Sequence, residues 1–264
     1  MQQNKISVVC PTYNSASFIV QAIKSVQQQE VLPAELIVSD DGSNDGTVEI
    51  VESLIGSCSG LNLRLIRNIH LGPGAARNAG IKAAVSEWVA FLDADDLWLP
   101  GKITAVLDVI RDNPECNFIC HNEQHILENG TCINVDYGAK YSPNKTLVSQ
   151  LFYNNLFSTS AVVCLRKMLI DCGGFDEGLM SGQDYELWMR MSPNIRVHFI
   201  RFVYGCYVIH QGNITSGNLE KRIKNNLIIR NRYRRQVGVW LYVWTMSRVL
   251  LSYVKVKFLT IIVP

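Results

Sequence analysis

The chain has 264 residues, of which 48% are hydrophobic and 18% are charged. This composition can build a large core and excludes an intrinsically disordered protein. The net charge of +2 hides an asymmetry, because ten Lys or Arg and no Asp or Glu occur from Lys221 to the end. An acidic body with a basic tail argues against nucleic acid as a partner and indicates that the tail meets an anionic surface.

The N-terminus and the cysteines indicate a cytoplasmic protein. The first five residues lead directly into an apolar run, without the pattern of a signal peptide. The eight cysteines mostly lie in apolar runs, as reduced, buried cysteines do. A zinc site is one interpretation of Cys116, Cys120, His121 and His125. However, a strand would point Cys120 and His121 to opposite faces, so we favour ordinary core cysteines.

Short apolar runs alternate with helical patterns along the first 120 residues. The periodicity predicts strands at 6–10, 36–38, 63–66, 88–92 and 117–120, and helices at about 16–29, 47–55, 74–85 and 100–110. This alternation predicts an α/β fold with a doubly wound, mostly parallel sheet flanked by helices. Right-handed crossovers then place all the strand-to-helix loops at one edge of the sheet.

Three carboxylates, Asp93, Asp95 and Asp96, directly follow the apolar run 88–92. Buried carboxylates are costly unless something pairs with them, and Mg²⁺ or Mn²⁺ prefers oxygen ligands. Ligands of α/β sheets bind at the carboxyl ends of the strands. We therefore predict a metal and a diphosphate here. For this stretch alone, a solvated acidic turn is the alternative.

Unusual residues also follow the other strands. In the loop after 36–38, Asp45 and Thr47 are expected to cap the next helix, whereas Asp41 directly follows a buried strand and shares an edge with the acidic loop. The segment Gly72–Gly80 carries Arg77 where a dinucleotide fingerprint needs its third glycine, so it suits an anionic ligand rather than that fingerprint. A surface salt bridge is the alternative for Arg77.

Four loops together resemble the family 2 glycosyltransferases of the GT-A fold. The segments that carry the resemblance are Val9–Asn14, Val38–Thr47, Gly72–Gly80 and Phe91–Asp96. The likeness runs from about Lys5 to His210. It implies an inverting enzyme of bacterial-type glycan or polysaccharide biosynthesis, with a nucleotide-sugar donor bound over the sheet edge and uridine favoured as the base.

The resemblance also implies roles for single residues. Pro11 and Tyr13 flank the base, Asp41 and Arg77 contact the nucleoside, Asp93 approaches the ribose, and Asp95 binds Mn²⁺ or Mg²⁺. Ala94 is also among the residues that bind the nucleotide sugar. His210 follows a strand-like run, where the family often has a histidine near the diphosphate and the metal. A purely structural histidine is the alternative at that position.

Asp184 is the candidate general base. It is predicted to begin a helix whose apolar face includes Trp188. A capping role is the alternative, but the helix dipole also favours the ionised carboxylate that a base needs. The stretch 173–190 resembles the family's Gly-Phe-Asp segment followed by an acidic pair, in which the second acid is the base. Gln183 replaces the first acid, and Glu186 is the reserve candidate.

The chain is expected to have two parts. Residues 1–217 form the GT-A domain, with a nucleotide-sugar half at 1–122 and an acceptor half at 123–217. Residues 218–264 form basic, aromatic helices. Their longest charge-free stretch, 236–247, is shorter than the roughly 20 apolar residues of a membrane-spanning helix. We predict that they lie in the membrane interface, peripheral to the inner face of the cytoplasmic membrane. Packing on the catalytic domain is the alternative.

The sequence therefore predicts a metal-assisted glycosyltransferase of the hexosyl or N-acetylhexosaminyl type. It would move one sugar from a nucleotide-diphosphate sugar to a hydroxyl of a glycan or lipid-linked acceptor, with Asp184 as the base. Gln183 keeps a second hypothesis open, a nucleotide-sugar-binding protein of the same fold without transfer activity.

Overall fold

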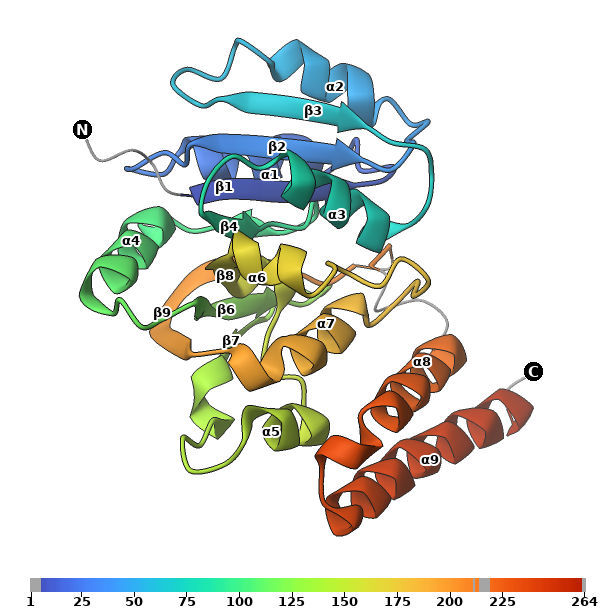
Figure 1. Cartoon of the computed structure of the whole chain (residues 1–264). Coiled ribbons are helices and arrows are strands. Elements are labelled where there is room, and N and C mark those ends of the chain that lie inside the picture. The colour runs from blue at the N-terminus through green and yellow to red at the C-terminus, as the bar shows by residue number, and fades with distance from the viewer. Residues whose placement is uncertain (1–5, 211, 214–218, 263–264) are drawn as a thin grey trace.

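The computed structural model describes residues 6–210, 212–213 and 219–262, of which 255–262 are described through the backbone alone. A mixed sheet with helices on both faces runs through the molecule, and a helical hairpin lies beside it at the C-terminal end (Figure 1). The strands are β1 (Ile6–Thr12), β2 (Glu35–Asp40), β3 (Leu63–Arg67), β4 (Trp88–Phe91), β5 (Leu97–Trp98), β6 (Phe118–Ile126), β7 (Cys132–Val135), β8 (Val162–Leu165) and β9 (Val197–Val208).

The helices connect these strands and form the C-terminal part of the chain. The α-helices are α1 (Ile19–Gln27), α2 (Thr47–Leu54), α3 (Pro73–Ala83), α4 (Lys102–Asp112), α5 (Leu147–Tyr153), α6 (Arg166–Asp171), α7 (Gln183–Met191), α8 (Leu219–Arg232) and α9 (Val239–Ile262). The 3₁₀ helices are η1 (Tyr137–Lys140), η2 (Thr159–Ala161), η3 (Ser192–Asn194) and η4 (Arg234–Gln236).

The first half of the sheet is the parallel arrangement that the sequence predicts. Its strands lie in the order β3-β2-β1-β4, and each neighbouring pair is parallel. Helix α3 packs closely on β1, because a Cβ atom at Gly80 would lie 2.4 Å from Val9 Cγ1. Only glycine permits this approach. The loops that follow β1, β2 and β4 therefore meet at one edge of the sheet.

The second half of the sheet is mixed rather than parallel. Strand β8 lies between β4 and β6 and runs antiparallel to both. Strand β9 runs parallel to β6, and β5 runs antiparallel to β9. The mostly parallel pattern thus holds for β1 to β4 and for the β6–β9 pair. The four residues of β8 form a short, apolar run, and such a run carries no information about strand direction or partner.

The two faces of the sheet carry separate cores. Val8 belongs to one core and Val9 to the other, because successive side chains of a strand point to opposite faces. Trp188 of α7 is fully buried and meets the ring of Phe91 at a centroid distance of 6.5 Å. Phe91 ends β4, two residues before Asp93, the first carboxylate of the acidic loop. This contact therefore fixes the first turn of α7, which carries Asp184, relative to that loop.

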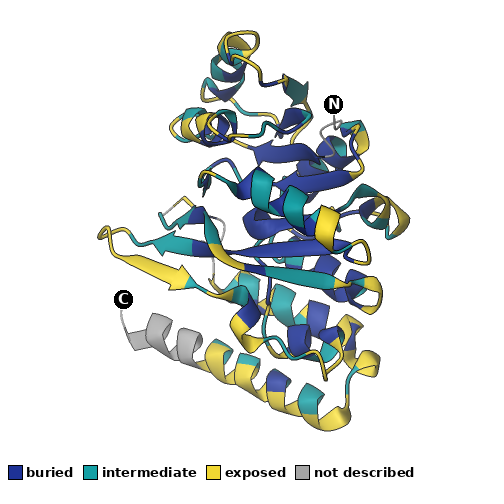
Figure 2. Ribbon diagram, turned by 90° about the vertical axis from the view of Figure 1, so that its left-hand side faces the viewer, coloured by how far each residue is buried: buried dark blue, intermediate teal, exposed yellow. Residues whose placement is uncertain are grey.

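The C-terminal hairpin of α8 and α9 packs on the domain with one face (Figure 1). Tyr233 donates a hydrogen bond of 2.6 Å to Glu186 of α7, and Trp244 stacks on Tyr153 of α5 at 4.8 Å. The other face of α9 is exposed (Figure 2), and Trp240 there is 87% exposed. Across the residues that the structure describes, no helix is both long enough and apolar enough to cross a membrane.

Candidate active site

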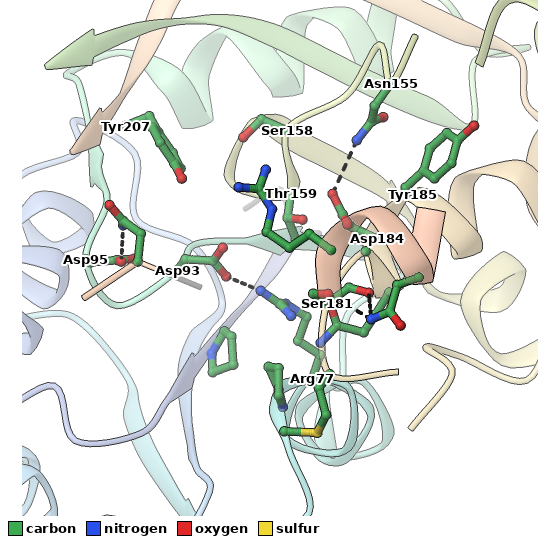
Figure 3. A pocket seen from close by; sticks show the side chains of 18 of the residues that line it. Arg77, Asp93, Asp95, Asn155, Ser158, Thr159, Ser181, Asp184, Tyr185 and Tyr207 are labelled. Carbon is green, nitrogen blue, oxygen red and sulfur yellow. Dashed lines mark hydrogen bonds and ion pairs between the residues drawn. The ribbon is translucent and has the colours of Figure 1, made fainter. Parts of the chain in front are cut away.

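One cavity of about 1020 Å³ lies at the carboxyl edge of the parallel strands. All the site residues that the sequence predicts line it: Pro11, Tyr13, Asp41, Arg77, Asp93, Ala94, Asp95, Asp184 and His210. They come from the end of β1 and the loop after it, from the loops after β2 and β4, from α3 and α7, and from the residues just after β9. Asp95 and Asp184 lie on opposite sides of this cavity in Figure 3. The structure places these residues together, and their individual roles stay predictions.

A stacked aromatic pair forms one part of the cavity wall. The rings of Tyr13 and His70 lie 4.3 Å apart and are nearly parallel. His70 Nδ1 lies 2.8 Å from Asp41 Oδ2, and Asp41 also accepts hydrogen bonds of 2.9 Å from the N–H groups of Leu71 and Gly72. Asp41 thus holds the loop that carries His70, so the flat pair is positioned before any ligand binds.

Arg77 is buried in the cavity wall, and the alternative of a surface salt bridge is wrong. Its side chain is 8% exposed, and Nη2 donates a 2.6 Å hydrogen bond to Asp93 Oδ1. The guanidinium also lies 5.4 Å from the centre of the Phe175 ring. Among the described residues Arg77 Nε has no hydrogen-bond partner. Arg77 therefore neutralises Asp93 and keeps one buried donor unsatisfied.

Asp95 and His210 are in direct contact. Asp95 Oδ2 accepts a hydrogen bond of 3.1 Å from His210 Nε2 and one of 2.8 Å from Asn213 Nδ2. The Gly212 N–H donates to His210 Nδ1, so Nε2 carries the proton that points to Asp95. The ring of Phe18 stacks on His210 at 4.5 Å. Burial and the nearby charge of Asp93 raise the pKa of Asp95 above its ordinary range.

Asp95 and His210 could bind a divalent cation side by side once the proton on His210 Nε2 moves to Nδ1 and the Gly212 N–H contact is released, because only an unprotonated ring nitrogen ligates a metal. Their 3.1 Å separation matches the roughly 3 Å between adjacent ligands of an octahedral ion bound at about 2.1 Å. Within the described part of the chain, no three His, Cys, Asp or Glu side chains are placed to hold an ion by themselves. Cys116 and Cys120 are buried, free cysteines.

Asp96, the third carboxylate of the acidic loop, faces away from the cavity. It is 1% exposed and accepts a 2.6 Å hydrogen bond from Ser160 Oγ, which itself accepts the Asp93 N–H at 3.0 Å. Lys102, also fully buried, donates to the Ser160 carbonyl at 2.8 Å. Burial and the charge of Glu123 raise the pKa of Asp96 well above its usual range. Asp96 therefore anchors the loop that presents Asp93 and Asp95.

Asp184 lies in the first turn of α7, as the sequence predicts. Gly182 occupies the N-cap position, so the alternative in which Asp184 caps the helix does not apply. Asn155 Nδ2 lies 3.4 Å from Asp184 Oδ2 (Figure 3). Burial raises the pKa of Asp184, and the Tyr185 N–H partly offsets that effect. The reserve candidate Glu186 is 3% exposed and does not line the cavity.

Several residues of the cavity have no counterpart in the sequence predictions. His70 lies in a loop at the predicted edge of the sheet, and Asn213 lies three residues after His210. Their positions in the sequence therefore gave a weak indication that they belong to the site. The position of Asn155 gave none, because only tertiary packing brings it to Asp184. The hairpin also lines the cavity, mainly through Arg222, Ile223, Asn225, Asn226, Arg230 and Ser252. Its place depends on how α8 and α9 fold back onto the domain.

A mixed α/β sheet with an acid-lined cavity at its carboxyl edge defines a protein of the GT-A class. The model of the family "Glycosyl transferase family 2" matches residues 7–174, and the chain belongs to that family. An uncharacterised glycosyltransferase of Rickettsia conorii is 32% identical over 203 residues, which cover 73% of this chain and 31% of that protein. The chain thus spans about a third of the length of this relative.

A second relative is similar over most of both chains. The UDP-Glc:α-D-GlcNAc-diphosphoundecaprenol β-1,3-glucosyltransferase WfgD of Escherichia coli is 27% identical over 225 residues, covering 84% of this chain and 83% of that enzyme. Staphylococcus aureus TarS in complex with UDP-GlcNAc superposes with a TM-score of 0.72 at 23% identity, covering 93% and 71%. The Pyrobaculum calidifontis mannosyltransferase PcManGT, in complex with GDP-Man and Mn²⁺, superposes at 0.66 and 18%, covering 94% and 73%. These two structures share the fold.

Proposed function

We propose that the chain is an inverting, metal-dependent glycosyltransferase. It moves one hexosyl or N-acetylhexosaminyl residue from a nucleotide-diphosphate sugar, with UDP favoured, to a hydroxyl of a glycan or lipid-linked acceptor. The observation that carries this proposal is the single cavity that holds Asp95 on one side and Asp184 on the other. The family and the name of the Escherichia coli relative support the donor and acceptor classes.

The donor nucleotide occupies the part of the cavity next to β1 and β2. The base lies against the Tyr13–His70 pair beside Pro11, and Asp41 and Arg77 face the nucleoside. Asp93 and Ala94 lie at the ribose. Asp95, with His210 after its Nε2 proton has moved, would hold Mn²⁺ or Mg²⁺ next to the diphosphate. A bound divalent cation offsets the negative charge that develops on the leaving nucleoside diphosphate.

Asp184 receives the proton of the acceptor hydroxyl from the other side of the sugar. Attack from that side in one displacement inverts the anomeric centre. A base must be ionised, and because burial raises the pKa of Asp184, its proton-accepting power is also increased. Arg77 is the cation whose charge counteracts this rise and helps keep Asp184 ionised. The nearby Asn155 amide orients the carboxylate.

Removing the His70 ring is expected to weaken nucleotide binding. In a His70→Ala variant, the Kd of UDP in the presence of Mn²⁺ should rise about 3- to 10-fold, since an aromatic pair contributes roughly 0.5–1.5 kcal/mol. Titration calorimetry measures this effect. His198, on β9 and outside the cavity lining, provides the control, and His198→Ala should leave the Kd unchanged. Equal UDP affinities of His70→Ala and His198→Ala would contradict the proposal that the nucleotide base lies against the Tyr13–His70 pair.

We also propose that the exposed face of α9 binds the inner surface of the cytoplasmic membrane. Trp240 is 87% exposed and Leu251 is 61% exposed, and their spacing of eleven residues places them on one face of the helix. Basic residues along α8 and α9 would add attraction to anionic lipid, about 1 kcal/mol for each one near the surface. The opposite face of α9 packs on the domain, so deleting the helix would also disturb the fold.

Two substitutions on the exposed face test this membrane contact. The double variant Trp240→Ser, Leu251→Ser should reduce co-sedimentation with phosphatidylglycerol vesicles about tenfold or more, because two apolar contacts with the bilayer are lost. Phe202→Ser is the matched control, since Phe202 is 70% exposed on β9. Its vesicle binding should equal that of the parent protein. Unchanged binding of the double variant would remove the membrane proposal.

A nucleotide-sugar-binding protein without transfer activity is the second candidate function. Gln183 favours it, because a neutral amide occupies the first position of the acidic pair beside Asp184. Thermal-shift measurements against a panel of nucleotide sugars, with Mn²⁺ and with chelator, identify the donor. A transfer assay with that donor then separates the two candidates. Binding without turnover for every acceptor tested would favour the binding protein.

A further inference from the structure

Arg230 of α8 is a buried cation without an acidic partner. It is 7% exposed and lines the cavity. Its Nε donates a 2.6 Å hydrogen bond to Asn226 Oδ1, and its Nη1 donates to the Phe152 carbonyl. No carboxylate pairs with Arg230 among the described residues. Burial lowers the pKa of Arg230, and the positive charge of Arg248, which repels that of Arg230, lowers it further. A buried charge with only neutral partners is costly, so the site is suited to an incoming anion.

Two further buried groups, both on the first turn of α7, also lack partners. The Tyr185 hydroxyl and the Gln183 Nε2 amide are without hydrogen-bond partners among the described residues, and both side chains are 5% exposed in the cavity wall. The Arg230 guanidinium lies 5.8 Å from the centre of the Tyr185 ring. Burial raises the pKa of Tyr185 to about 12, so its hydroxyl keeps its proton. Both groups are therefore available as donors.

The charge of this part of the cavity differs from that of the donor part. The cavity residues contributed by α8 and α9 include Arg222 and Arg230 and no Asp or Glu. The first turn of α7, with the positive end of its helix dipole, adjoins them, since a Cβ atom at Gly182 would lie 3.3 Å from Ile229 of α8. Asp184 belongs to the same turn of α7, but the positive charge that opposes the burial-driven rise in the pKa of Asp184 is that of Arg77.

We propose that the cavity wall formed by α7 and α8 binds a phosphate group carried by the acceptor. Arg230 is the counter-ion, and Tyr185 and Gln183 donate hydrogen bonds after side-chain rotation. This inference rests on the proposed transferase function and deepens it, because it assigns the acceptor to the phosphate- or diphosphate-linked class. The acceptor's phosphate then holds its hydroxyl beside Asp184, on the side opposite the donor diphosphate.

Binding of a simple anionic amphiphile tests the subsite. Decyl diphosphate, without any sugar, is titrated into the full-length protein that has been saturated with UDP and Mn²⁺. In Arg230→Gln the Kd should rise about 10- to 100-fold, as expected for the loss of a charge-assisted hydrogen bond. Arg230→Lys should recover part of that loss. Tyr185→Phe, which keeps the ring, should raise the Kd about 3- to 10-fold.

Arg232→Gln is the matched control. Arg232 is on the same helix but pairs with Asp176 at 2.6 Å and does not line the cavity. Its Kd should equal that of the parent protein. An unchanged Kd in Arg230→Gln, or an equal loss in Arg232→Gln, would overturn the subsite. If Arg230→Gln does not fold, the Kd values of Arg230→Lys and Tyr185→Phe for decyl diphosphate test the subsite instead. Unchanged values in both variants would overturn it.

Two comparisons separate the sources of the phosphate and the two proposals. Arg230→Gln should leave binding to phosphatidylglycerol vesicles unchanged. A parallel loss of vesicle binding would assign the site to a lipid headgroup and overturn the acceptor assignment.

Decyl diphosphate binding that behaves as expected, without any glycosyl transfer, would contradict the transferase proposal alone. Transfer to a neutral glycoside that is as sensitive to Arg230→Gln as transfer to a diphosphate-linked sugar would contradict the subsite alone.

Discussion

Replacing Asp184 by Asn is expected to lower glycosyl transfer about 10³-fold, while the Kd of UDP stays within about twofold. A positioned general base contributes roughly 10²- to 10⁴-fold, and Asn keeps the size of the side chain but cannot accept the proton. Asp184 lies across the cavity from the predicted metal site, so we expect nucleotide binding not to depend on it. Steady-state kinetics with a fixed donor, together with UDP titration of the same preparation, measure both quantities.

The pH profile and a second carboxylate provide the controls. Because burial raises the pKa of Asp184 above the ordinary 3.8, the rate of the parent enzyme should fall as the pH drops through that raised value. Asp184→Asn should lose this acid limb. Glu186→Gln should instead lower the thermal stability, since Glu186 is buried and bound to Arg190 and Tyr233. Turnover of Asp184→Asn at the parental rate would exclude Asp184 as the base.

Replacing Asp95 by Ala is expected to remove the dependence of transfer on Mn²⁺ and to lower kcat at least 100-fold. A bound metal stabilises the developing charge by several kcal/mol, and each 1.36 kcal/mol corresponds to a factor of ten. Asp95 and His210 are the two side chains whose 3.1 Å contact suits adjacent metal ligands. Initial rates measured over a range of Mn²⁺ concentrations, and after treatment with chelator, quantify the loss.

An exposed carboxylate far from the cavity is the control for Asp95. Asp108 lies on α4, is about half exposed and pairs with Arg111 on the surface. Asp108→Ala should leave both the rate and the Mn²⁺ dependence unchanged. If Asp95→Ala retains the Mn²⁺ response of the parent enzyme, then the cation is bound elsewhere. In that case the role of His210 in the metal site would also be withdrawn.

The edge of the parallel sheet and most of the candidate site were predictable from the sequence. Apolar runs of strand length alternate with amphipathic helices, and right-handed connections then bring the loops after β1, β2 and β4 to one edge. Tyr13 and Asp41 directly follow β1 and β2, and Asp95 lies four residues after the end of β4, so local order along the chain was enough to group them. The family resemblance added Asp184, which local patterns alone could not distinguish from a helix cap.

Long-range packing determined the features of the fold and of the site that the sequence did not predict. In the sequence alone, the three carboxylates of the acidic loop are equivalent. In the structure, Ser160, which lies 64 residues after Asp96, donates a hydrogen bond to Asp96 in the core, whereas Asp95 lines the cavity. The direction of β8 and the position of Arg230 likewise depend on partners far away in the chain. Hydrophobic periodicity determines which side of an element is buried. Which distant element covers that side is decided by side-chain packing in three dimensions, and local sequence does not encode it.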